Sequence, residues 1–187
     1  MRNPRQALRL GIAYLPEDRK GQGLFGSLPI RYNAAIAIIR TLASFGGLSV
    51  RAGREDALAR TYVRDLAIKT PSTATKVSNL SGGNQQKVVL ARWLASKPRI
   101  FILDEPTRGI DVSSKQEIHN LIVSLARQGV AIIVISSELL EVLKLSDRLL
   151  TMHEGRLTGE FGRDAPPSAV LAAAMGEGAD RARHATA

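Results

Sequence analysis

The chain has 187 residues, of which 44% are hydrophobic and 23% are charged, a composition typical of a globular protein that can bury a sizeable core in one domain. It contains no cysteine, which excludes disulfides and thiolate metal sites, and its longest apolar runs fall far short of the roughly 20 residues that span a membrane. The net charge is +9, but Lys and Arg are dispersed and aromatic residues make up only 4%, which argues against a nucleic-acid-binding surface.

The first part of the chain predicts a strand, a connection and two helices. Gly11 to Leu15 predicts a short strand that leads into a loop at Glu17, and Gln22 to Pro29 predicts a glycine-rich connection. Arg31 to Leu42 and Glu55 to Ile68 predict helices. The second helix has apolar residues at four-residue spacing, namely Leu58, Tyr62 and Leu66, and this spacing by itself indicates only core packing.

The octapeptide LSGGNQQK, at residues 80–87, has the properties of an anion site. Ser81 is a suitable N-cap for a helix predicted from Asn84 to Leu94. Gly82 and Gly83 would let another molecule approach the backbone closely. The N-terminus of such a helix has free N–H groups and a partial positive charge, which suit a phosphate. Taken alone, the octapeptide is also compatible with a capped helix after a Gly-Gly turn.

The segment IFILDEPTRGID, at residues 100–111, predicts a buried strand that ends in two carboxylates. Ligands of open α/β sheets bind at the carboxyl ends of the strands, so Asp104 could hold Mg²⁺ directly or through water. Glu105 could position or deprotonate the water that attacks a γ-phosphate. The alternative is that the pair only starts a loop and caps the next helix. The wider pattern of DEPT followed by GID favours the catalytic interpretation.

The second half of the chain predicts an α/β core. Ser113 to Gln128 predicts a helix with a capping box formed by Ser113 and Gln116, and Gly129 ends it. The apolar face of this helix comprises Ile118, Leu121, Ile122, Leu125 and Ala126. Val130 to Ile135 predicts another buried strand, so that strand, helix and strand form a parallel crossover.

Three shorter elements are predicted after this crossover. Arg148 to Met152 and Arg156 to Phe161 predict a hairpin around the dipeptide Glu154-Gly155. Ser168 to Met175 predicts a short helix after two prolines. The polar remainder is expected to be disordered, because it cannot bury enough apolar surface to offset its ordering entropy.

These motifs occur in the order of a known family. LSGGNQQK, followed at this distance by ILDEP and a GID turn, resembles the signature, Walker B and D-loop sequence of ATP-binding cassette (ABC) ATPases. The NQQK continuation, PTRGID and YLPEDRKGQGL at residues 14–24 resemble the second cassette of the tandem ATPases that drive bacterial import of ribose, galactose, xylose and related sugars. The resemblance covers residues 10–161 and implies ATP and Mg²⁺ as cofactors.

The resemblance implies an α/β fold of the P-loop NTPase class, with a parallel sheet and flanking helices. The phosphate loop of that class, GxxxxGK[ST], does not occur in the 187 residues and would be expected upstream of Met1. We therefore expect a partial cassette at residues 1–163. Within it, about 30–97 would form a helical signature subdomain and 98–163 the core that contains the Walker B strand. Residues 164–187 would form the short helix and a disordered tail.

Two positions depart from the active pattern of the family. Glu17 stands where a Q-loop Gln would help to coordinate Mg²⁺, and Ser137 stands where a switch His would be expected. Serine cannot carry the charge that His can carry near a γ-phosphate. Second cassettes of sugar importers resemble this chain in both departures. They are usually regarded as the degenerate half of an asymmetric pair.

In such pairs each nucleotide lies between the phosphate loop of one cassette and the signature of the other. The resemblance implies that Asp104 is a metal ligand and Glu105 a catalytic residue of the weaker site. The nucleotide-binding residues that it implies, most of them serving the partner's site, are Leu80, Ser81, Gly82, Gly83, Asn84, Gln85, Asp111, Glu17 and Ser137. Implied partners are a complete nucleotide-binding cassette, membrane permease subunits and, indirectly, a sugar-binding protein, at the cytoplasmic face of the bacterial plasma membrane.

Three functions of different classes are compatible with the sequence. The first is an energy-coupling subunit, in which two cassettes close around ATP and reopen after hydrolysis. The second is a regulatory or remnant module that lacks Walker A, has no ATPase activity alone and presents its signature to a complete cassette. The third is a nucleic-acid-linked ABC protein, which would need coiled-coil or basic insertions that the sequence does not contain.

Overall fold

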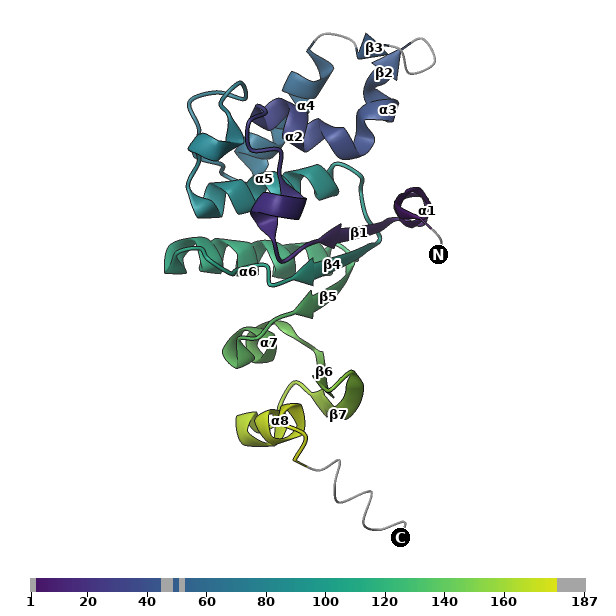
Figure 1. Ribbon diagram of the computed structural model, residues 1–187, viewed down its shortest axis with the longest axis vertical. Helices are drawn as coiled ribbons and strands as arrows, with labels where there is room; N and C mark the ends of the chain where they lie inside the picture. The colour runs from purple at the N-terminus through teal and green to yellow at the C-terminus, as the bar shows by residue number, and fades with distance from the viewer. Residues whose placement is uncertain (1–2, 45–48, 51–52, 178–187) are drawn as a thin grey trace. The chain divides into compact units, whose positions relative to one another are not determined.

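The computed structural model describes residues 3–44, 49–50 and 53–177, and the chain divides into two compact units, Met1–Ile135 and Ser136–Ala187 (Figure 1). The domain limits expected from the sequence, including the helical subdomain at about 30–97, stay a prediction. Most of the expected disordered tail falls on residues 178–187, which lie outside the described residues. Within the described ranges, no helix is both long enough and apolar enough to cross a membrane.

The first unit is built on a parallel sheet of three strands in the order β1-β4-β5 (Figure 1). These strands are β1 (Ile12–Leu15), β4 (Ile100–Asp104) and β5 (Ala131–Ile135). A short helix, α1 (Pro4–Arg9), precedes β1, and α6 (Val112–Arg127) forms the crossover from β4 to β5. The predictions of strands at the first two places and of a parallel crossover are confirmed.

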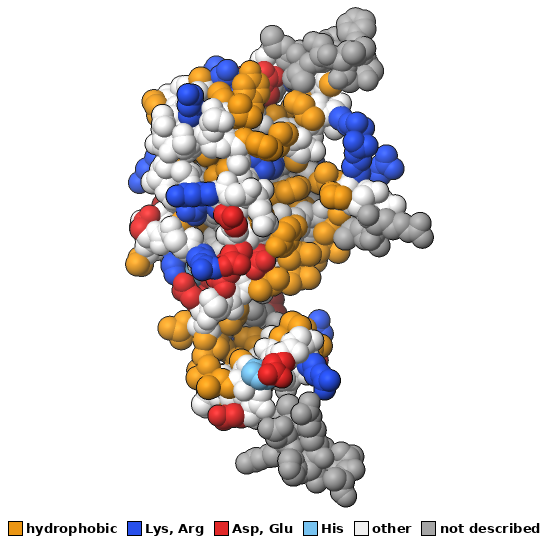
Figure 2. All heavy atoms as spheres, viewed as in Figure 1, with side chains coloured by type: hydrophobic (Ala, Val, Ile, Leu, Met, Phe, Trp, Pro, Cys, Tyr) orange, Lys and Arg blue, Asp and Glu red, His pale blue; other side chains and the backbone are white. Residues whose placement is uncertain are grey.

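One face of this sheet is packed and the other is open. Its packed face buries Ala13, Leu15, Phe101 and Leu103, and α5 (Gly82–Leu94) contacts both β1 and α6. On the open face Tyr14 is 43% exposed, Ile133 is 51% exposed and Ile135 is 48% exposed. Hydrophobic side chains accordingly gather at the surface over the strands (Figure 2).

The prediction of a buried strand at Val130 to Ile135 is therefore wrong in its burial. The strand exists, but its residues alternate between exposed and half-buried positions. A continuous apolar run is typical of a strand covered on both faces. Here β5 lies at the edge of the sheet in the described part of the chain, and helices cover only one of its faces.

The helical part of the first unit lies between β1 and β4 in the sequence. Its helices are α2 (Ile30–Ala35), the 3-10 turn η2 (Ile36–Ile38), α3 (Ile39–Leu42), α4 (Arg54–Asp65), the 3-10 turn η4 (Val77–Asn79) and α5. Two two-residue strands, β2 (Ala43–Ser44) and β3 (Ser49–Val50), pair antiparallel. The helix predicted from Arg31 to Leu42 is thus interrupted by η2.

A π-helical turn, η1 (Arg19–Gly23), follows the loop at Glu17. The Asp18 carboxylate caps this turn by accepting a hydrogen bond of 2.9 Å from the Gly21 N–H. The glycine-rich connection predicted from Gln22 to Pro29 therefore begins two residues later than expected, because Gln22 and Gly23 belong to η1. The turn packs on α5, where Val89 lies beside Gly23.

A buried polar network joins α2 to α5. The Arg92 guanidinium donates to the Asn33 carbonyl at 3.0 Å and to the Asn33 side-chain oxygen at 2.8 Å. Asn33 also accepts from the Phe25 N–H and donates to the Phe25 carbonyl. Burial lowers the pKa of Arg92 to about 10, because desolvation disfavours the charged form. One asparagine therefore fixes both α5 and the connection after η1.

The predicted capping box of α6 is wrong. Asp111, rather than Ser113, occupies the N-cap, and its carboxylate accepts a hydrogen bond of 2.9 Å from the Ser114 N–H. Ser113 lies inside the first turn and donates its hydroxyl to Asp111 at 2.6 Å. Both residue types are good caps, so the sequence left two possible starting points, two residues apart. Gly129 adopts a φ of +90° after the helix, as expected at a helix end.

The second unit contains a hairpin and two helices. Its elements are α7 (Leu139–Leu145), β6 (Arg148–His153), β7 (Arg156–Gly162) and α8 (Pro167–Ala174). The strands pair antiparallel around Glu154 and Gly155, both with positive φ, which confirms the predicted hairpin. The predicted terminal helix is α8, which packs on both strands and buries Val170 and Ala173.

Candidate functional site

Asp104 and Glu105 lie at the carboxyl end of β4, where the sequence predicted them. The Asp104 carboxylate accepts a hydrogen bond of 2.8 Å from the hydroxyl of Tyr14 on the neighbouring strand β1. This hydrogen bond is the main cause that raises the pKa of Tyr14, with burial and the negative charge of Asp104 adding to it. The contact orients the carboxylate, and nothing in the local sequence pattern pointed to it.

Glu105 has an unusual backbone conformation. Its φ is +46°, a left-handed value that a residue with a side chain seldom adopts. Its N–H donates to the Ile135 carbonyl at 2.8 Å, and its carbonyl accepts from the Arg108 N–H at 3.1 Å. These two bonds end the strand ladder and turn the chain sharply toward Pro106. Strain of this kind is concentrated at functional sites, so the geometry agrees with a working role for this residue.

The octapeptide forms the start of α5. Ser81 occupies the N-cap position, as predicted, but its hydroxyl makes no bond to the N–H groups of the first turn. Instead it accepts a hydrogen bond of 2.8 Å from the Asn84 amide, whose oxygen in turn accepts from the Lys69 N–H at 2.8 Å. Within the described chain, the first-turn N–H groups are therefore not capped by the Ser81 side chain.

Gln85 points inward from the same helix. Its amide donates to the carbonyls of Val77 and Leu80, at 3.3 and 3.1 Å, and the residue is buried. The next residue, Gln86, donates to the Pro106 carbonyl at 2.8 Å. These bonds hold the octapeptide against the preceding turn and against the segment that follows β4.

The two glycines of the octapeptide pack against that segment. A Cβ on Gly82 would lie 3.1 Å from the Gly109 carbonyl oxygen. A Cβ on Gly83 would lie only 2.2 Å from the Ser114 hydroxyl, which is closer than real side chains approach. The close packing at these glycines is therefore between α5 and the N-terminus of α6. The approach of another molecule, which the sequence predicts here, stays a prediction.

Asp111 is the polar centre of this contact. Its carboxylate accepts three hydrogen bonds, from the Ser113 hydroxyl, the Ser114 N–H and the Ser114 hydroxyl. These bonds, led by that of the Ser113 hydroxyl, hold the pKa of Asp111 far below its usual range. The carboxylate is therefore charged at any physiological pH and firmly oriented.

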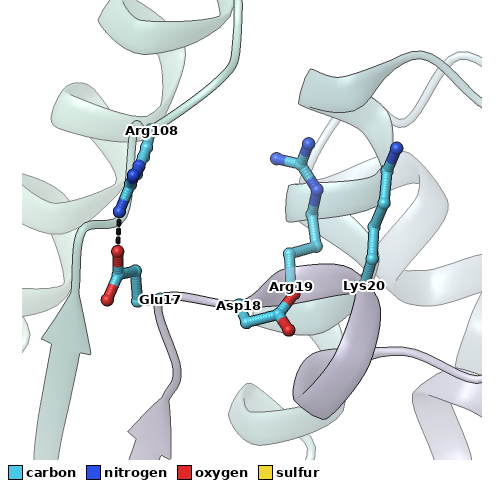
Figure 3. Close-up of a pocket in the computed structure, with 5 residues that line it drawn as sticks. All are labelled: Glu17, Asp18, Arg19, Lys20 and Arg108. Atoms are coloured by element: carbon cyan, nitrogen blue, oxygen red, sulfur yellow. Dashed lines mark ion pairs between the residues drawn. The ribbon is translucent and has the colours of Figure 1, made fainter.

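Glu17 lines a pocket together with Arg108, which lies in the segment that follows β4. Its carboxylate forms an ion pair with Arg108 (Figure 3). The pocket has a volume of about 420 Å³ and is lined by Glu17, Asp18, Arg19, Lys20 and Arg108. Arg19 and Lys20 extend side by side from η1 and lie apart from the Glu17–Arg108 pair (Figure 3). The sequence singled out Glu17 alone among these five residues.

Ser137 belongs to the second unit. It is exposed and follows Ser136, whose hydroxyl accepts a hydrogen bond of 3.1 Å from the Glu138 N–H. The first unit by itself therefore brings together the loop at Glu17, the start of α5 and the segment from Asp104 to Asp111. The role expected of Ser137 stays a prediction.

The carboxylates of the first unit suit one kind of metal. Among the described residues, no group of three or more His, Cys, Asp and Glu side chains could hold an ion. Mg²⁺ is commonly bound in proteins by one or two carboxylates, with waters and substrate phosphates as its other ligands. Asp104 and the adjacent Glu105 fit that requirement and do not fit an all-protein cage.

A family model described as ABC transporter matches residues 1–108. The chain is 50% identical over 162 residues to a putative ribose/galactose/methyl galactoside import ATP-binding protein of Rhizobium johnstonii, covering 87% of this chain and 31% of that protein. It is 48% identical over 176 residues to the ribose import ATP-binding protein of Rhodopirellula baltica, covering 94% and 34%. It is 51% identical over 158 residues to the xylose import ATP-binding protein of Thermoanaerobacter pseudethanolicus, covering 84% and 31%.

Solved structures agree on the fold. A nucleotide-free ATP-binding cassette from an ABC transporter superposes with a TM-score of 0.73 at 23% identity, covering 91% of this chain and 68% of that one. Another cassette, in its ADP conformation, gives a TM-score of 0.70 at 20% identity, covering 95% and 70%. The chain thus spans about a third of the length of its curated relatives and about two thirds of a solved cassette.

Proposed function

The chain belongs to the ABC transporter family, and on this premise we propose that it forms part of an ATP-binding cassette that energises carbohydrate import. Relatives with about half of their aligned residues identical are described as ribose, galactose and xylose import ATP-binding proteins, which supports a sugar as the cargo. The family binds ATP, and ATP is the proposed cofactor here together with Mg²⁺. The choice of sugar would rest with other subunits.

One observation carries the proposal. The start of α5 is in contact with the segment that follows β4, through Gly82 on Gly109 and Gly83 on Ser114. A helix N-terminus of the kind that suits a phosphate is thereby joined to the strand that ends in two carboxylates, within one unit. Phosphoryl transfer requires such positioning and electrostatic stabilisation and little covalent chemistry from the protein.

The proposed roles follow from these positions. The signature residues Leu80, Ser81, Gly82, Gly83, Asn84 and Gln85, with Asp111, complete the nucleotide site of a partner cassette. Ser81 and the glycines would face the phosphate, whereas the side chains of Gln85 and Asp111 hold the backbone in place through the bonds described above. Asp104 would hold Mg²⁺, which neutralises phosphate charge when bound, and Glu105 would orient the attacking water.

The proposal assigns the phosphate loop to a different segment. The sequence GxxxxGK[ST] does not occur in the 187 residues. The open sheet face has exposed apolar side chains at Tyr14, Ile133 and Ile135, and Asp104 lies at the carboxyl end of its central strand. This supports packing of a further segment on that face. Parallel sheets of α/β proteins are covered by helices on both faces, whereas in the described chain helices cover only one face of this sheet.

The site that contains Asp104 and Glu105 is proposed to be the weaker of two. Glu17 is occupied by its ion pair with Arg108 and adds negative charge where the family uses a neutral Gln. Ser137 cannot supply the charge of a His. The stronger site would be the partner's, completed by the signature. Permease subunits and, indirectly, a sugar-binding protein are the proposed partners, at the cytoplasmic face of the plasma membrane.

A chimera tests the proposal. The whole chain replaces the matching third of the Rhodopirellula baltica ribose import ATP-binding protein. We expect the chimera to hydrolyse ATP and to support ribose uptake in cells that depend on it. Gly82→Asp should lower both by at least about tenfold, because it puts a negative charge where a phosphate binds. Gly26→Asp is the matched control, since the nearest atom to a Cβ there is 3.9 Å away.

The alternatives have their own outcomes. Ser81→Ala, at an exposed position, repeats the test without crowding and guards against misfolding of Gly82→Asp. Full uptake with both substitutions would contradict the proposal. A folded chimera without ATP hydrolysis would favour an inactive regulatory module. Salt-sensitive binding of RNA or DNA by the purified chain would favour the nucleic-acid-linked alternative.

A further inference from the structure

Arg19 is a half-buried cation without a described partner. Its Nε atom is fully buried and makes no hydrogen bond. Burial lowers the pKa of the Arg19 guanidinium, which nevertheless stays charged at neutral pH. A buried donor without an acceptor costs free energy, so a ligand that brings an acceptor to this position would be stabilised.

The guanidinium of Arg19 lies beside a second positive group, the N-terminus of α5, which raises the free-energy cost of leaving its charge unpaired. One of its terminal nitrogens lies 3.3 Å from the point that a Cβ on Gly82 would occupy, so the cation lies against the first residue of α5. That end of the helix is itself partially positive, and the Ser81 hydroxyl does not cap it. Two positive groups in contact repel each other unless an anion lies between them.

The carboxylates nearby are already engaged. Glu17 is paired with Arg108, and Asp18 accepts the Gly21 N–H as the cap of η1. Figure 3 shows Glu17 pointing at Arg108, while Arg19 and Lys20 lie side by side on the other side of the pocket. The pocket volume of about 420 Å³ falls within the roughly 300–1,000 Å³ of ligand sites.

The backbone that presents Arg19 is rigid. Arg19 is the first residue of η1. Within this turn the N–H groups of Gln22 and Gly23 donate to the Asp18 carbonyl at 2.9 and 3.2 Å. The same turn packs on α5 through Gly23 and Val89. Pre-organisation of this kind lowers the entropy that a bound ligand must overcome.

The geometry points to Arg19 as a phosphate-binding residue that, with Lys20 beside it, holds the terminal phosphate of the nucleotide bound at the start of α5. Guanidinium groups suit phosphate because their N–H donors form paired, charge-assisted hydrogen bonds. The inference rests on the proposed function, since that nucleotide would be ATP carried by a partner cassette. It adds a ligand that the octapeptide itself does not contain.

The chimera described above provides the test, with ATP and ADP as the probes. Arg19→Gln should weaken ATP binding by about tenfold, measured as KM, through the loss of charge-assisted hydrogen bonds. ADP lacks the terminal phosphate, so its inhibition constant as a competitor of ATP should differ by less than about twofold between Arg19→Gln and the unsubstituted chimera. Arg19→Lys should recover part of the loss. Arg127→Gln, an exposed arginine in the last turn of α6, is the control and should change neither value.

The outcomes separate this inference from the proposed function. If Ser81→Ala impairs the chimera but Arg19→Gln does not, the inference is overturned and the proposed function stands. If Ser81→Ala, Gly82→Asp and Arg19→Gln all leave the chimera unchanged, the inference and the proposed function both fall. Equal weakening of ATP and ADP with Arg19→Gln indicates a structural role only and overturns the inference. Lys20→Gln, at an exposed position where folding is not at stake, should raise the KM for ATP by about threefold.

Discussion

At the scale of single residues, Gly83 shows how tightly the octapeptide is packed. Gly83→Ala should destabilise the chain by about 1–3 kcal/mol, because the new Cβ would lie 2.2 Å from the Ser114 hydroxyl and 2.6 Å from its Cβ. The better helix propensity of Ala offsets only part of this cost. Urea unfolding measures it, with Gly26→Ala as the control. Addition of Ser114→Gly should recover only part of the loss, because it removes the clash but also the bond from the Ser114 hydroxyl to Asp111. An unchanged midpoint for Gly83→Ala alone would contradict the packing.

Asp111 is a second residue with a testable effect: its charged carboxylate stabilises the fold, and this contribution depends on pH. Its pKa is depressed in the folded state, chiefly by the Ser113 hydroxyl and then by the two bonds from Ser114. Its stabilising effect is therefore complete above the unfolded pKa of about 3.9 and is lost as pH falls toward the lower folded pKa. Asp111→Asn should lower the urea midpoint at pH 7, and the difference from wild type should narrow below about pH 4. A constant difference down to pH 3 would refute this.

At the scale of elements, the hydrogen-bond network that joins α2 to α5 depends on one buried asparagine, Asn33. Asn33→Ala should destabilise the chain by about 3 kcal/mol, because the buried Arg92 would lose its bond to the Asn33 side-chain oxygen and the Phe25 N–H would lose its acceptor. Urea unfolding is again the measurement. Asn120→Ala, on the exposed face of α6, is the matched control and should cost less than about 0.5 kcal/mol. Similar midpoints for the two variants would show that the network contributes little.

Prediction of elements from the sequence succeeded where the signal was local. The hairpin around Glu154 and Gly155, the strand before Asp104 and the helix after Ser81 all depend on neighbouring residues and their propensities. The capping box of α6 was misplaced by two residues because Asp111 and Ser113 are both good caps. The structure has Asp111 as the cap of Ser114, and Ser114 in turn lies against Gly83, a residue 31 positions away.

At the scale of the whole molecule, the open sheet face of the first unit should govern association. The double substitution Ile133→Thr and Ile135→Thr should reduce binding of a hydrophobic dye and self-association in sedimentation, since it removes exposed apolar surface. The free energy of unfolding should change by less than about 0.5 kcal/mol per site. Ile132→Thr, on the packed side of the same strand, should destabilise more and leave dye binding unchanged. If dye binding fell with Ile132→Thr and not with the double substitution, the face would not be open in solution.

The sequence by itself determined the family, the α/β class and the order of the motifs, because each motif is a short run whose residues act together on one turn of backbone. Tertiary structure alone decided how the motifs meet. Tyr14 on Asp104, Glu17 on Arg108 and Arg19 beside Gly82 join residues separated by 63 to 91 positions, and no local pattern encodes such a distance. Burial was likewise decided at this level: the same apolar run forms a buried or a half-exposed strand according to which layers cover it.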